Sequence, residues 1–208
     1  MISTKSAALI LVIVVVSFLG FCVENVFISF SHGFVDNRNM VLPFLFGYGL
    51  SILAYYHLFG TPDNPLYFSK EISFPSSNLA TIYCFIVAFL GVSIGEIILG
   101  YLTEWSVGII WWNYSAIPLH ITRYTSVPTS FCFALLITVF MKYLFTPLLN
   151  GFSKMNPQVL SFLSLLLVLL LSLDMINSAA YMFKKHDTLH LWRYDFAKPL
   201  KDFLLTSK

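Results

Sequence analysis

The chain has 208 residues, of which 58% are apolar and only 11% are charged, and its formal net charge is +2. Soluble domains carry about 25% charged residues, so this composition excludes a soluble catalytic or nucleotide-binding domain as the main content of the chain. Five or six membrane crossings of roughly 20 residues each use nearly its whole length. The basic residues form no stripe interleaved with aromatic residues, which argues against nucleic acid as a partner.

The apolar segments predict an all-α, polytopic bundle of about five transmembrane helices. The first segment follows Lys5 and is too long for a cleaved signal peptide, so we expect a retained helix. The second begins at Pro43, which a first helical turn tolerates, and ends before the breaker-rich run 60–65. The third contains Gly91 and Gly95 in a GxxxG spacing, which favours close approach of another helix. The expected helices are about 7–30, 42–59, 79–103, 128–149 and 159–183.

The segment 105–127 is apolar enough to enter a bilayer but also contains proline, asparagine and charged residues. Irregular backbone at membrane depth must be buried in protein or line a cavity, so one prediction is a re-entrant segment. The other is an interfacial aromatic belt, with its tryptophans and tyrosines at headgroup level. The two predictions are compatible with each other.

The orientation prediction comes from counting lysines and arginines on each side of five crossings. One side has Lys5, Lys70 and Lys154. The other side, which includes the basic tail 184–208, has Arg38, Arg123, Lys184, Lys185, Arg193, Lys198, Lys201 and Lys208. The positive-inside rule therefore predicts a multi-pass protein of the cell membrane with a cytoplasmic C-terminus.

Five ionisable residues fall inside or at the ends of the predicted helices: Glu24, Glu96, Glu104, Lys142 and Asp174. Such groups are costly in a membrane and need either a partner or a purpose. Glu96 and Glu104 lie roughly 80° apart on one helix, so they could line one cavity. The functional alternative is a polar path for a cation, a proton or a polar headgroup. The structural alternative is mutual neutralisation, for instance of Lys142 by Glu96 or Asp174.

Familiar catalytic and nucleotide-binding motifs are missing from the sequence, which has no Walker A motif, no H-E-x-x-H and no G-x-S-x-G. His186 and His190 are four residues apart, but an amphipathic tail explains this spacing better than a metal site does. The three cysteines are too widely separated to be metal ligands. We therefore expect no cofactor and no metal, and an enzyme is the less favoured class.

Three blocks of polar and aromatic residues resemble the bacterial ABC-transporter type IV permeases, the CmpB-like membrane proteins. The first is similar to G-W-C-x-E, the second to N-R followed by P-F-L-x-x-Y-G, and the third to E-x-x-x-G followed by W-W-D-Y-S and a proline. In this chain the blocks are Gly20–Glu24; Asn37-Arg38 with Pro43–Gly49; and Glu96–Gly100, Glu104, Trp111–Ser115 and Pro118. The resemblance implies a helical permease with a separate energy source.

The chain departs from the family pattern at several positions. Phe21 replaces a tryptophan, and the stretch between Arg38 and Pro43 is one residue shorter. Asn113 replaces the acidic residue of W-W-D-Y-S, which weakens a cation or proton role at that position. Where the family has an asparagine-rich N-L-N-G run, this chain has residues 120–123, so a pocket there would differ in charge.

Together these observations predict a permease-like or transport-accessory subunit with a polar, carboxylate-lined cavity for a small polar or ionic substrate. The alternative is a membrane-embedded enzyme or binding protein for a lipid or isoprenoid headgroup, with Arg38 and Arg123 on the phosphate. Expected partners are the lipid bilayer, a separate ATPase or second membrane subunit, and a second copy of the chain. The predicted substrate-binding residues are Glu24, Asn37, Arg38, Tyr48, Glu96, Glu104, Trp112, Asn113, Tyr114, His120, Arg123 and Asp174.

Overall fold

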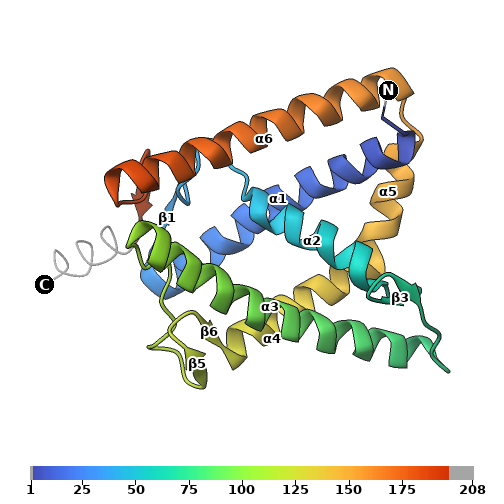
Figure 1. The fold of residues 1–208 in the computed structure, drawn as a ribbon, viewed down its shortest axis with the longest axis horizontal. Coiled ribbons are helices and arrows are strands. Elements are labelled where there is room, and N and C mark those ends of the chain that lie inside the picture. The colour runs from blue at the N-terminus through green and yellow to red at the C-terminus, as the bar shows by residue number, and fades with distance from the viewer. Residues whose placement is uncertain (1, 197–208) are drawn as a thin grey trace, which may run out of the picture.

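The computed structural model describes residues 2–196 and consists mainly of long helices with short strand pairs at both ends (Figure 1). This arrangement confirms the predicted helical membrane bundle. A π-helical turn, Phe140–Leu144, lies between the fourth and fifth helices. The helices are α1 (Thr4–His32), α2 (Phe46–Phe59), α3 (Ser77–Val107), α4 (Val127–Val139), α5 (Phe145–Ser153) and α6 (Pro157–Lys185).

Four helical units within residues 2–196 are long and apolar enough to cross a membrane, namely α1, α3, the continuous unit Val127–Ser153, and α6. The fifth expected crossing corresponds to α2, which has only 14 residues. Its rise of about 21 Å is shorter than the roughly 30 Å hydrocarbon core. The helix starts at Phe46 rather than near residue 42, because Leu45 has non-helical backbone angles (φ −99°, ψ 87°) and its amide donates to the Ser17 carbonyl of α1.

Helix starts and ends follow local capping chemistry. The Ser76 and Ser126 side chains accept hydrogen bonds from backbone amides in the first turns of α3 and α4, and the Asn156 side chain does the same for α6. These contacts satisfy amides that have no partner within the helix. Gly33 and Gly108 end α1 and α3 in the left-handed region, which suits glycine.

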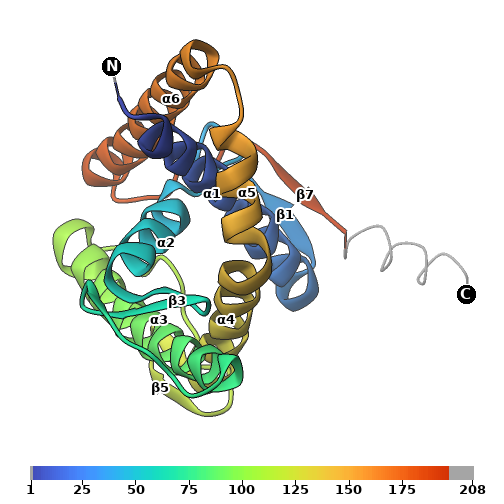
Figure 2. The same ribbon diagram turned by 90° about the vertical axis from the view of Figure 1, so that its right-hand side faces the viewer.

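The central helix is α1, which packs against α2, α5 and α6, whereas α3 packs mainly against α4 (Figure 2). Two glycines bring α1 and α2 together. A Cβ added at Gly20 would lie 2.6 Å from the Tyr48 ring, and one added at Gly49 would lie 2.4 Å from the Ser17 hydroxyl. The backbones can approach this closely only because both positions lack a side chain.

The predicted GxxxG motif does not make such a contact within the described chain. A Cβ added at Gly91 or Gly95 would meet nothing within 4 Å, so this face of α3 packs against no other described element. Within residues 2–196 the close helix contact is made by the glycines of α1 and α2, and a contact of the GxxxG face with a second copy of the chain stays a prediction.

The last part of the α4–α5 unit is bent (Figure 1). Pro147 lies in the first turn of α5, directly after the π-helical turn, and has no amide to donate to the carbonyl four residues earlier. Proline and π-bulges are the usual causes of sharp helix kinks. The bend turns α5 toward the start of α6.

Small sheets of two or three short strands lie at opposite ends of the bundle. The sheet β2–β3–β4 (Gly60–Thr61, Asn64–Tyr67 and Lys70–Glu71) lies at the end where α3 begins. At the other end, called here the C-terminal end, β1 (Phe34–Asp36) pairs with β7 (Arg193–Asp195), and β5 (His120–Thr122) pairs with β6 (Thr125–Ser126). The described part of the predicted basic tail, residues 184–196, therefore includes the strand β7, which returns to pair with the strand after α1. Residues 197–208 of that tail lie outside the described residues.

Much of the predicted re-entrant or interfacial segment is a loop and a hairpin. Its first residues, up to Val107, complete α3, and residues 108–126 then form a loop and the β5–β6 hairpin before α4 begins. These residues are called here the α3–α4 segment. It lies at the C-terminal end of the bundle, against α3 and α4.

Candidate functional site

Two glutamates from different helices are held by hydroxyl groups. Glu24 of α1 accepts a hydrogen bond from the hydroxyl of Tyr48 in α2. Glu96 of α3 accepts one from Thr125 Oγ1 at 2.7 Å, and that hydroxyl also contacts Ser130 Oγ at 3.0 Å. Both glutamates are half-buried. Five elements, α1, α2, α3, β6 and α4, thus contribute to one polar cluster.

Tyr114 connects the two glutamates. Its side chain is buried, and burial raises the pKa of its phenol above the usual value of 10.0. The charges of Glu96 and Glu24 raise this pKa further, whereas the charge of Arg38 lowers it. Tyr114 therefore lies within electrostatic reach of both carboxylates and of one arginine. Residues Glu24, Tyr48, Glu96, Tyr114 and Thr125 are called here the carboxylate site.

The carboxylate site lies well inside the bundle. Glu24 is eight residues before the end of α1, and Glu96 is eleven residues before the end of α3. These spacings correspond to depths of about 12 Å and about 16 Å from the C-terminal ends of the helices. Across residues 2–196, neither glutamate has a lysine or arginine within salt-bridge distance.

Carboxylates in a poorly solvated environment require a proton, a cation or several hydrogen bonds. The carboxylate site provides only hydroxyl donors. In the part of the chain that the structure describes, no group of three or more His, Cys, Asp and Glu side chains could hold a metal ion. The donor set therefore suits a proton or a small cation better than a tightly coordinated divalent metal.

Arg38 and Asn37, predicted site residues, lie in a strained loop beside β1. Arg38 and Asn39 have φ values of 50° and 64°, in the left-handed region that most side chains avoid. The buried Asn37 and Asn39 side chains hold this conformation by hydrogen bonds to the backbone of residues 189–191. Arg38 Nη1 lies 3.4 Å from Asp36 Oδ1, and its Nε is buried without a partner.

Glu104, Arg123 and Trp112 belong to a second cluster around Tyr124. Arg123 donates to Glu104 Oε1 at 3.1 Å, and the Tyr124 hydroxyl donates to Glu104 Oε2 at 2.7 Å. Trp112 Nε1 donates to the Tyr124 carbonyl at 2.8 Å. A Cβ added at Gly100 would lie 2.1 Å from the Tyr124 ring, so this ring occupies space that only a glycine leaves free. The cluster holds the α3–α4 segment on α3.

The remaining predicted site residues lie apart from the carboxylate site. Asp174 is buried and accepts hydrogen bonds from two backbone amides that precede α2, which is a structural contact. Asn113 is exposed and accepts from the Ser115 amide, and His120 is exposed on β5. Lys142 donates to Thr81 Oγ1 at 3.0 Å, so it pairs with neither of the acids proposed as its partner.

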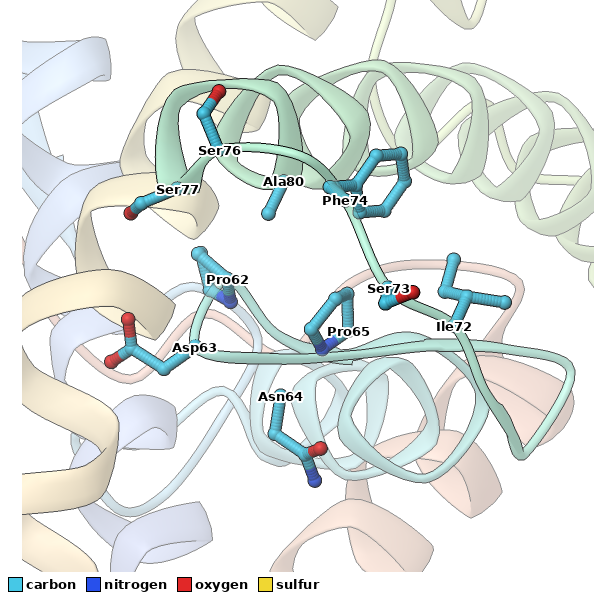
Figure 3. Close-up of a pocket in the computed structure, with 10 residues that line it drawn as sticks. All are labelled: Pro62, Asp63, Asn64, Pro65, Ile72, Ser73, Phe74, Ser76, Ser77 and Ala80. Carbon is cyan, nitrogen blue, oxygen red and sulfur yellow. The ribbon is translucent and has the colours of Figure 1, made fainter.

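A pocket of about 350 Å³ lies at the opposite end of the molecule (Figure 3). It lies between residues 62–65, which form the β2–β3 turn and the start of β3, and the start of α3 at Ser76 and Ser77. None of the predicted site residues lines it. We place the candidate site at the carboxylates, because the pocket contains one exposed carboxylate, Asp63, and no cluster of ionisable groups.

Three residues of these clusters are not among the predicted site residues: Thr125, Ser130 and Tyr124, the last of which the sequence places only in the interfacial aromatic belt. A local signal was available, because Ser126 followed by Pro128 is typical of a helix N-terminus. That signal places Thr125 just outside α4, where a backbone turn can direct its side chain toward the preceding helix. The contacts with Glu96 and Glu104 depend on tertiary packing and have no counterpart in local sequence.

Comparison with known proteins gives one match. The model of the family described as “putative ABC-transporter type IV” matches residues 11–179, which is most of the chain. Searches of curated proteins and of solved structures gave no match. The matched region includes the three blocks whose residues Glu24, Tyr48, Glu96 and Tyr114 meet in the carboxylate site. The chain therefore belongs to this ABC-transporter type IV family.

Proposed function

We propose that the chain is a permease-like or transport-accessory membrane subunit whose carboxylate site binds a small cation or a proton. One observation carries this proposal: Glu24 and Glu96 lie on different helices, deep in the bundle, and face hydroxyl groups instead of basic side chains. Ionisable groups at this depth that lack a neutralising partner are typical of ion and proton paths.

The chemistry of the ligating groups supports a cationic substrate. Ionised carboxylates and neutral hydroxyls offer oxygen lone pairs, and an approaching cation recovers the electrostatic energy lost when the acids leave water. An anion would be repelled by the same two groups. A proton, a monovalent ion or a protonated amine would each satisfy the site without a full metal coordination shell.

The energy source for transport is proposed to lie outside this chain. The sequence has no nucleotide-binding motif, and family membership is consistent with a separate ATPase or a second membrane subunit. An ion gradient coupled through Glu24 and Glu96 is the alternative. We further propose that the C-terminal end of the bundle faces the cytoplasm, since it has the basic residues Arg38, Arg123, Lys184, Lys185 and Arg193.

The contacts of the two arginines favour this proposal over a lipid or isoprenoid headgroup enzyme. A phosphate site would need Arg38 and Arg123 to converge with free donors. Arg38 instead contacts Asp36, and Arg123 contacts Glu104 in the separate cluster around Tyr124. Each arginine thus already has an acidic partner.

The proposal is tested with the tagged chain purified in mild detergent together with any subunit that remains attached. The preparation is reconstituted into vesicles that contain a pH-sensitive dye, and proton flux is driven by a potassium diffusion potential. Radiolabelled methylammonium uptake is measured in parallel. We expect Glu96→Gln and Glu24→Gln to reduce the active flux at least tenfold, because both variants keep a hydrogen-bond acceptor but lose the charge.

The matched control is Glu71→Gln, which changes an exposed carboxylate at the opposite end of the bundle and should leave flux unchanged. Equal proton and methylammonium fluxes in the wild type and in both site variants would contradict the proposal. A stoichiometric lipid in the purified preparation, found by native mass spectrometry without cation flux, would support the headgroup-binding alternative.

A further inference from the structure

Three positions on one face of α3 contact the α3–α4 segment. Glu96, Gly100 and Glu104 follow one another at four-residue spacing, which keeps them on the same side of the helix. Thr125 contacts the first of them, and Tyr124 contacts the other two. These two neighbouring residues of the segment thus belong to different clusters. Thr125 is part of the carboxylate site. Tyr124, with its contacts to Gly100 and Glu104, is called here the Tyr124 anchor.

The anchor is formed by tight packing and one charge-assisted hydrogen bond. Tyr124 is fully buried, with a relative exposure of 0%. Its hydroxyl donates to Glu104 Oε2 at 2.7 Å, and its ring packs edge-on against the rings of Tyr101 and Trp112. The space for the ring exists because position 100 has no Cβ. Such a side chain has little freedom to move unless the whole segment moves.

The backbone connects this anchor to the carboxylate site. The Tyr114 amide donates to the Arg123 carbonyl at 2.7 Å, next to Tyr124 in the chain, and Thr125 follows Tyr124 directly. A shift of the anchored ring would therefore move Thr125 Oγ1, which donates to Glu96, and Tyr114, whose phenol lies within electrostatic reach of Glu96. Placement to within about 0.5 Å is what a binding site requires of its supporting residues.

We propose that Tyr124 is a positioning residue for the carboxylate site. Its ring packs against Gly100 and its hydroxyl donates to Glu104, and these contacts hold the α3–α4 segment in place. Tyr114 and Thr125 then lie next to Glu96 and limit the access of water to the carboxylate site. The part of this inference that concerns a bound cation rests on the proposed function. The part that concerns access to the site does not.

The test uses a thiol reporter inside the site. Ser130 is fully buried and lies 3.0 Å from Thr125 Oγ1, and Ser130→Cys is introduced after the three native cysteines have been replaced by alanine. The full chain in detergent is treated with a water-soluble methanethiosulfonate reagent, and the modification rate is followed by mass spectrometry. Methylammonium chloride is the probe for protection of the site.

We expect Tyr124→Phe to raise the modification rate roughly tenfold, the size expected when a hydrogen bond to a charged acceptor is lost. The half-protecting concentration of methylammonium should rise by a similar factor. The matched control is Tyr101→Phe, since the Tyr101 hydroxyl has no hydrogen bond within residues 2–196. This control should leave both the modification rate and the half-protecting concentration of methylammonium unchanged.

A second variant separates binding from positioning. Thr125→Val removes the hydroxyl that contacts Glu96 but keeps the anchor, so protection should weaken while the modification rate without methylammonium stays near that of the parent. Amide hydrogen exchange of α1 and α6 reports whether any variant has lost its overall fold.

The inference is overturned if Tyr124→Phe and Tyr101→Phe give the same modification rate. It is also overturned if the rate rises only together with faster exchange throughout the bundle, since that result would indicate a general loss of stability. Faster modification with no methylammonium protection even in the parent would support the positioning role and count against the proposed cation.

Discussion

Replacement of Gly100 by alanine is the sharpest test of how the α3–α4 segment is docked. The added Cβ would lie 2.1 Å from the Tyr124 ring, against an ordinary carbon–carbon contact of roughly 3.5 to 4.0 Å. The ring would therefore have to withdraw by more than about 1 Å. That movement would strain its hydrogen bond to Glu104 and displace the segment.

The expected magnitude combines two opposing effects. Overpacking a tight contact costs about 1 to 3 kcal/mol, whereas alanine in place of glycine stabilises a helix interior by roughly 0.5 to 1 kcal/mol. The net destabilisation for Gly100→Ala should therefore be on the order of 1 to 2 kcal/mol. The assay is equilibrium unfolding in mixed detergent micelles, followed by tryptophan fluorescence, with amide exchange of the α3–α4 segment as a local readout.

The control for this prediction lies on the same helix. A Cβ at Gly95 would meet nothing within 4 Å, so Gly95→Ala should be neutral or slightly stabilising. If Gly100→Ala proved as stable as Gly95→Ala, with unchanged exchange in the segment, the close packing of Tyr124 on α3 would be refuted.

Three further predictions concern other parts of the fold. Gly49→Ala should destabilise the chain more than Gly47→Ala in the same unfolding assay, because only the first would collide with the neighbouring helix α1. Asp174→Asn should lower the free energy of unfolding by about 1.5 to 3 kcal/mol, because the amide side chain makes weaker hydrogen bonds with two backbone amides. The control is Asn177→Ala at an exposed position, and equal melting curves for the two variants would contradict the prediction. Burial and the hydrogen bond to Glu104 raise the pKa of Tyr124 to about 12. The neutral phenol therefore stabilises the fold fully below pH 10, and this contribution is lost as the pH rises toward 12. Tyr124→Phe should lack that component of alkaline unfolding, and identical pH profiles would count against it.

Several features of the molecule could be predicted from local sequence. Runs of about 20 apolar residues with few charges determine membrane-spanning helices, because lipid cannot satisfy polar backbone groups outside a helix. The breaker-rich run 60–65 and the Ser126–Pro128 signal likewise mark helix boundaries through local backbone chemistry. Such effects need no knowledge of distant residues.

The relative rotation of the helices could not be predicted in this way. In water, an apolar stripe indicates the buried face of a helix. Here lipid and neighbouring helices are both apolar, so leucine and isoleucine surround each helix and the pattern does not identify the packed face. The glycine spacing likewise does not identify the contact made within the chain: Gly91 and Gly95 remain open in residues 2–196, whereas Gly20 and Gly49 make the close contact between α1 and α2.

Only the tertiary structure decided which polar residues meet. Sequence reasoning identified Glu24, Glu96, Glu104 and Asp174 as costly groups that need partners, because burial of any carboxylate has that cost. The structure places the first two together, assigns Glu104 to the Tyr124 anchor and gives Asp174 two backbone amides. The need for a partner is a property of each residue, whereas the identity of the partner depends on long-range packing between helices.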